Sequence, residues 1–78
     1  MRIEYDEKAD ALYIALNDRP YAFGRDLDDR RRIDFDAEGQ PIGVELLFPS
    51  RGVDLHGLPL DASVGRQIAA NYRFAVRA

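Results

Sequence analysis

The sequence predicts an α+β domain: an antiparallel β-sheet of about four or five strands built from hairpins, with one C-terminal helix packed on it. Two observations predict the sheet, because apolar and polar residues alternate along residues 1–16 and again along residues 31–46, each time around a turn. A third observation predicts the helix, because Val64, Ile68 and Tyr72 recur at four-residue spacing after a loop rich in glycine and proline.

The first hairpin is predicted over residues 1–16. One register gathers its apolar side chains on a single face of the sheet. The predicted pairs are Tyr5 with Leu12, Ile3 with Ile14, and Met1 with Leu16. The polar residues 6–10 form the turn, where Asp6 and Asp10 are expected to accept hydrogen bonds from nearby backbone amides.

A third, less regular strand is predicted around Tyr21, Phe23 and Leu27, after a cluster of turn-forming residues. The second well-defined hairpin covers residues 31–46 and turns at Gly39. Its predicted pairs are Ile33 with Val44 and Phe35 with Ile42 on the apolar face, and Arg32 with Glu45 on the polar face.

The segment from Asp34 to Gly39, followed by Glu45, nearly fits the spacing of a calcium-binding loop. Such a loop is flanked by helices, whereas both flanks here alternate with period two, so the sequence favours a plain hairpin. In that interpretation the aspartates near both hairpin turns form the turns. These turn-forming carboxylates are Asp6, Asp10, Asp34 and Asp36.

A single domain is predicted over residues 1–78, and residues 1–48 form its β-hairpin sheet. Residues 49–60 carry glycines and prolines and predict an irregular crossing loop whose apolar side chains pack over the sheet. A helix is predicted over residues 61–72, capped by the aspartate that begins it, and residues 73–78 are expected to form a tail or a short strand.

Because the chain has no cysteine and one histidine, it cannot use a thiol in catalysis, form a disulfide or build a three-histidine zinc site. No nucleophile motif is present, so we expect no enzyme activity and no cofactor. Carboxylates are the remaining reactive groups. An alternative hypothesis is therefore a carboxylate-based metal binder or enzyme that uses Asp6, Asp10, Asp34 and Asp36.

A domain of 78 residues buries little apolar surface by itself, which favours a homo-oligomer, most simply a dimer. The leading hypothesis is a small non-enzymatic protein-interaction module that self-associates. Its expected interface consists of one outward-facing aromatic residue of the sheet and of apolar residues in the helix and tail. These residues are Tyr13, Val64, Ile68, Tyr72 and Phe74.

Charge and hydropathy limit the other partners. The net charge of −3 makes nucleic acid an unfavoured partner. No apolar stretch is long enough to cross a membrane, and the first residues show no signal-peptide core, so we expect a cytoplasmic protein. The excess of arginine over lysine suggests a bacterial genome.

Two separated blocks of the chain resemble a family in their order and spacing. The first is Tyr5-Asp6-Glu7-Lys8-Ala9-Asp10-Ala11-Leu12-Tyr13-Ile14; the second is Asp34-Phe35-Asp36 with Gly39, followed by Ile42-Gly43-Val44-Glu45-Leu46. Over about residues 1–48 the chain is similar to the small prokaryotic domain of unknown function 2283. The resemblance implies a compact β-rich domain without established catalytic residues. Some members look like partners of small toxin-like proteins, which implies an antitoxin-like role as a second alternative.

Overall fold

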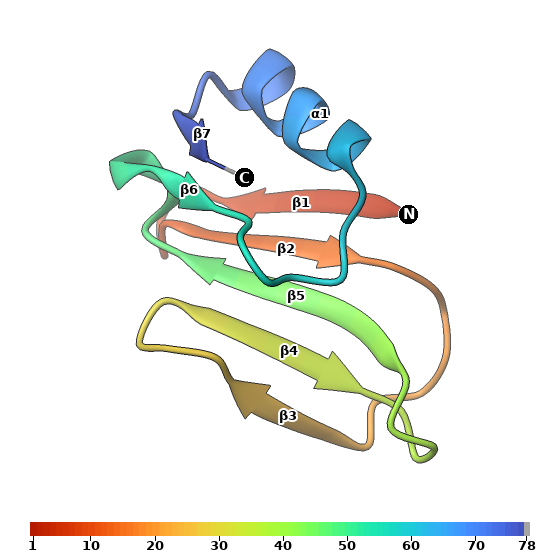
Figure 1. The fold of residues 1–78 in the computed structure, drawn as a ribbon. Helices are drawn as coiled ribbons and strands as arrows, with labels where there is room; N and C mark the ends of the chain where they lie inside the picture. The colour runs from red at the N-terminus through yellow and green to blue at the C-terminus, as the bar shows by residue number, and fades with distance from the viewer. Residues whose placement is uncertain (78) are drawn as a thin grey trace.

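The computed structural model describes residues 1–77 and contains a five-stranded antiparallel sheet, a C-terminal α-helix and a two-stranded parallel sheet (Figure 1). In space the large sheet follows the order β1-β2-β5-β4-β3, with the bounds β1 Arg2–Asp6, β2 Ala11–Ala15, β3 Phe23–Asp26, β4 Arg31–Phe35 and β5 Pro41–Leu47. The other elements are a 3-10 helix (Pro49–Arg51), β6 (Val53–Asp54), α1 (Ala62–Tyr72) and β7 (Val76–Arg77). The predicted α+β fold is confirmed.

The first hairpin has the predicted register. Its ladder contains the predicted pairs Ile3 with Ile14 and Tyr5 with Leu12. The ladder stops one position before the predicted pair of Met1 with Leu16. Alternation therefore places the apolar side chains of both strands on the face that the helix covers.

The second hairpin has the predicted register at two positions and another register at the third. The pairs Ile33 with Val44 and Arg32 with Glu45 are confirmed. The predicted pair of Phe35 with Ile42 is wrong, because a β-bulge at the end of β4 places Phe35 opposite Pro41. Pro41 has no amide hydrogen and fits the start of a strand beside a bulge. The shift leaves the side chain of Ile42 buried at 6% exposure.

Strand β5 lies at the centre of the sheet and joins the two hairpins, because β2 pairs with it on one side and β4 on the other. Val44 of β5 is thereby flanked by Ile14 and Ile33. The core lies between this part of the sheet, the crossing loop and the helix. Its buried members are Leu12, Ile14, Val44, Leu46, Val53, Leu58, Val64 and Ile68.

The helix begins as predicted, since the Asp61 carboxylate accepts a hydrogen bond from the Ser63 amide at 2.8 Å and caps the first turn. Gly65 lets the helix approach the crossing loop, because a Cβ there would lie 3.2 Å from the Leu55 side chain. After the helix, β7 pairs in parallel with β6 of the crossing loop, a contact that the sequence did not predict. Of the predicted tail 73–78, Ala78 lies outside the described residues.

Helix α1, β6 and β7 lie toward the β1 side of the sheet, and β3 lies at the opposite side (Figure 1). The helix therefore covers one part of the sheet and leaves another part without a second layer. No helix within residues 1–77 is long and apolar enough to cross a membrane.

Candidate functional site

Asp6 and Asp10 lie at the two ends of the β1–β2 turn. Asp6 accepts a hydrogen bond from the Ala9 amide at 3.2 Å. Asp10, in the left-handed backbone region at a φ of 49°, accepts from the Tyr5 hydroxyl at 3.0 Å and from the Ser50 amide at 3.3 Å. The hydrogen bond from the Ser50 side chain holds the pKa of Asp10 below its ordinary value. Asp10 thus ties the first turn to the 3-10 helix that follows β5.

Asp36 is a buried carboxylate at the β4–β5 turn, with 6% exposure. It accepts hydrogen bonds from the amides of Glu38 and Gln40, both at 2.9 Å, and forms an ion pair with Arg19 at 2.8 Å. The Gln40 amide is the main cause that lowers the pKa of Asp36 from its ordinary value. Asp36 therefore orders its own turn and anchors the loop that follows β2.

Asp34 lies within strand β4 and not in the turn where the sequence placed it. One carboxylate oxygen accepts from the Tyr13 hydroxyl at 3.0 Å, and the other accepts from the Arg32 guanidinium at 3.3 Å. Tyr13 reaches Asp34 across Gly43, where a Cβ would lie only 1.9 Å from the tyrosine oxygen. Burial, with a smaller contribution from Asp34, raises the pKa of Tyr13 to about 12.

This geometry separates the four carboxylates that sequence reasoning grouped together. Asp10 and Asp36 serve different turns, and Asp34 lies on the face of the sheet that α1 does not cover. In the described part of the chain, residues 1–77, no group of three or more His, Asp or Glu side chains is placed to hold a metal ion.

The five expected interface residues fall into different environments. Val64 and Ile68 are 2% and 0% exposed in the core of their own chain, so they offer no free surface while this fold persists. Tyr72 and Phe74 stack with centroids 5.7 Å apart, and both pack edge-on against Tyr5 of β1. Tyr13 lies on the opposite face of the sheet, held by Asp34 as described above. The structure thus does not gather these residues into one surface.

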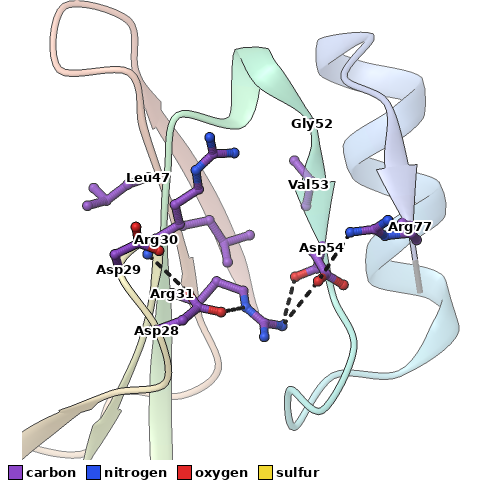
Figure 2. Close-up of a pocket in the computed structure, with 10 residues that line it drawn as sticks. Asp28, Asp29, Arg30, Arg31, Leu47, Gly52, Val53, Asp54 and Arg77 are labelled. Carbon is purple, nitrogen blue, oxygen red and sulfur yellow. Dashed lines mark hydrogen bonds and ion pairs between the residues drawn. The ribbon is translucent and has the colours of Figure 1, made fainter.

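A cleft of about 300 Å³ lies between the β3–β4 turn and strands β6 and β7 (Figure 2). Arg31 lines it, with a side chain only 14% exposed, and donates to the Asp28 carboxylate at 2.8 Å and to the His56 carbonyl oxygen at 2.6 Å. The Asp54 carbonyl oxygen accepts from Arg31 at 3.3 Å, and the Asp54 carboxylate pairs with Arg77 at 3.6 Å. These charges neutralise one another, so the cleft is better explained as a clasp between two parts of the fold than as a ligand site.

The most open apolar surface lies along β3. This strand pairs with β4 on one side, and within residues 1–77 no strand pairs with its other side. Tyr21, Phe23 and Leu27 are 56%, 42% and 43% exposed. The Phe23 ring stacks on Phe35 with centroids 5.0 Å apart, and the Arg25 guanidinium lies 5.7 Å from the Phe35 centroid. The Tyr21 hydroxyl accepts a hydrogen bond from the Arg32 guanidinium at 3.1 Å, so Tyr21 turns toward the other face of the sheet. We name the surface formed by Phe23, Arg25, Leu27 and Phe35 the aromatic edge.

The other edge strand, β1, is covered. The Tyr72 hydroxyl donates to the Ile3 carbonyl oxygen at 3.4 Å, and Tyr5 packs against Tyr72 and Phe74. Covering an edge with a helix or loop is one way in which proteins prevent unwanted strand pairing. The chain has such a cover at β1, whereas β3 shows only the single charges of Arg25 and Asp26 as protection.

Sequence reasoning missed the aromatic edge, although a signal for it was present. Tyr21, Phe23 and Leu27 alternate on one segment, and the apolar stripe of the helix is too narrow to cover a whole sheet of five strands. Which strands stay uncovered depends on the sheet order. That order places β3 last because β5 pairs with β2, a contact between distant segments.

The carboxylates predict a loss of stability in acid. Asp36 and Asp61 have lowered pKa values, through the Gln40 amide and the Ser63 side chain respectively. In acid the unfolded chain therefore binds more protons than the folded chain. The stabilisation that these two carboxylates provide is fully present above their ordinary pKa of 3.8, and it is lost as the pH falls through their lower pKa values in the folded chain. Urea titrations between about pH 6 and about pH 2 should show this decline, and Asp36→Asn should reduce its slope. An unchanged slope in Asp36→Asn would contradict the assignment.

Comparison with known proteins gives one family. Neither the curated proteins nor the solved structures compared with the chain gave a match. A family model described as protein of unknown function DUF2283 matches residues 2–50, which include β1 to β5 and most of the 3-10 helix. Both hairpins and both ordered turns lie within this segment. The chain belongs to the DUF2283 family of proteins of unknown function.

Proposed function

We propose that the chain is a non-enzymatic protein-interaction module that associates with a second copy of itself. The observation that carries the proposal is the aromatic edge, where the large apolar side chains of Phe23 and Leu27 stay 42% and 43% exposed on a strand with one unpaired side. Exposed apolar side chains that gather at one place mark interaction sites more often than scattered ones do. A chain of 78 residues also gains more from covering such a surface than a larger domain would.

The ordered polar groups support an interaction role over a catalytic one. Asp10, Asp36 and Arg31 each bond to backbone amides or carbonyl oxygens and thereby join separate segments of the chain. A catalytic group would instead need to reach a substrate with its polar atoms. The aromatic edge also differs from the interface expected from the sequence, since it uses Phe23 in place of Val64 and Ile68.

The native mass at several protein concentrations tests this proposal. We expect a transition from 8.9 kDa to twice that mass as the concentration rises. Phe23→Lys should raise the dissociation constant by at least about tenfold, because a charge replaces an aromatic anchor. Phe48→Lys is the matched control, since Phe48 is 39% exposed and lies outside the aromatic edge. A mass of 8.9 kDa for the wild-type chain at every concentration would overturn the proposal.

A further inference from the structure

The backbone of β3 directs hydrogen-bonding groups to the free side at known positions. The Leu27 amide donates to the Arg31 carbonyl oxygen at 2.7 Å, so Leu27 faces β4. In an antiparallel strand, alternate residues direct their amide and carbonyl groups to the same side. Arg25 therefore also faces β4, and the amide and carbonyl groups of Gly24 and Asp26 point away from the sheet. Strand β3 offers a short, regular template for one more antiparallel strand.

A second β3 is a suitable occupant, because a two-fold axis perpendicular to the sheet pairs two antiparallel copies of one edge strand. This axis leaves the same face of both sheets on the same side, so residues that lie opposite each other must point to the same face. Because side chains alternate between the faces, this holds only when one residue lies opposite its own copy, on the axis. The possible centres within the strand are Phe23, Gly24, Arg25 and Asp26.

Charge excludes two of these centres. An axis at Arg25 places two guanidinium groups opposite each other, and an axis at Asp26 does the same with two carboxylates. Like charges directly opposed across strands are destabilising. An axis at Phe23 would place Gly24 opposite Ala22, but the Ala22 amide already donates to the Phe35 carbonyl oxygen at 2.8 Å. The same axis would place Asp26 opposite Pro20, which has no amide hydrogen, so no pair around Phe23 could exchange both backbone hydrogen bonds, whereas two copies of Gly24 could.

The remaining centre is Gly24, where the outward backbone groups of two copies of the same residue meet. Its outward amide and carbonyl groups would bond reciprocally with those of the second Gly24. On the face of the aromatic edge, Phe23 would lie opposite Arg25 of the other copy. Each Phe23 ring, already stacked on Phe35, would then gain a cation contact, as Phe35 has within the chain.

We propose that two copies of the chain pair β3 with β3 in antiparallel register around Gly24, so that their sheets join into one continuous sheet. This inference rests on the proposed self-association and names its surface and register. The covered β1 edge stays outside the interface, which limits the assembly to a closed dimer and prevents a growing fibre.

Disulfide trapping tests the register, and the chain is suited to it because it has no cysteine of its own. Bonded antiparallel pairs have Cα atoms about 5.5 Å apart, within the range that a disulfide spans. Gly24→Cys should therefore form a covalent dimer roughly tenfold faster than Arg25→Cys or Asp26→Cys, which are self-paired only in the rejected registers. Glu4→Cys on the covered β1 edge is the matched edge control, and it should cross-link slowly.

A Cβ at Gly24 would come within 2.3 Å of the Arg32 side chain, so Gly24→Cys requires that side chain to move. A second pair of variants therefore leaves Gly24 unchanged. A mixture of Ala22→Cys and Asp26→Cys chains should give the mixed covalent dimer in preference to either homodimer. If the wild-type chain has a dimer mass but Arg25→Cys or Glu4→Cys cross-links fastest, the register is overturned and the proposed self-association stands. A monomer mass at every concentration would overturn both.

Discussion

Ile68→Ala should lower the free energy of unfolding by about 3–5 kcal/mol, the largest effect we expect from a single substitution in this chain. Ile68 is fully buried in the core that the helix shares with Leu12 and Ile14 of β2. Truncation removes apolar contacts and leaves a cavity that the rigid sheet cannot fill. Because a domain of this size is stable by only about 4–12 kcal/mol, this loss is a large part of its total stability.

Urea unfolding followed by circular dichroism measures this effect. Gln67→Ala is the matched control, because Gln67 is the exposed neighbour of Ile68 in the same helix, and its change should stay within about 0.5 kcal/mol. A stable Ile68→Ala chain would show that the helix does not pack on its own sheet. That result would return Ile68 to the interface predicted from the sequence.

Arg31→Ala should lower the free energy of unfolding by about 2–3 kcal/mol. The guanidinium of Arg31 holds the Asp28 carboxylate of the β3–β4 turn and the carbonyl oxygens of Asp54 and His56 in the crossing loop. Truncation leaves these acceptors without their donor in a site where the arginine side chain is only 14% exposed. The crossing loop should separate from the sheet at this end.

The matched control is Arg30→Ala, because Arg30 is an exposed neighbour in the same turn. Its cost should stay within about 0.5 kcal/mol. Arg31→Lys should recover only part of the loss, since a lysine ammonium cannot reproduce the planar fork that reaches several acceptors. Equal stability of Arg30→Ala and Arg31→Ala would refute the role of Arg31 as a clasp.

The local features of the fold could be predicted from the sequence because each depends on neighbouring residues. Period-two alternation gave the pairs of Ile3 with Ile14 and Ile33 with Val44, and Asp61 was identifiable as a helix cap. The bulge at Phe35 was missed because alternation alone predicts an unbroken ladder. Pro41, which lacks an amide hydrogen, was the signal for it.

The long-range features could not be predicted in the same way. The pairing of β2 with β5 and of β6 with β7 joins distant segments, and neither strand pair is connected by a tight turn. The contact between Tyr13 and Asp34 depends on that pairing, because it crosses Gly43 of β5. The aromatic edge follows from the sheet order for the same reason. Sequence reasoning therefore located the hairpins but not the order of the strands in the sheet, on which the exposure of the aromatic edge depends.

Amide hydrogen exchange at β3 tests the central claim most directly. The Gly24 amide points to the free side of the sheet, and it should exchange slowly at high protein concentration and fast at low concentration. Amides of Leu12 and Val44, inside the sheet, should be protected at both concentrations. Fast exchange of the Gly24 amide at a concentration where the chain is dimeric would contradict pairing of β3 with β3 around Gly24.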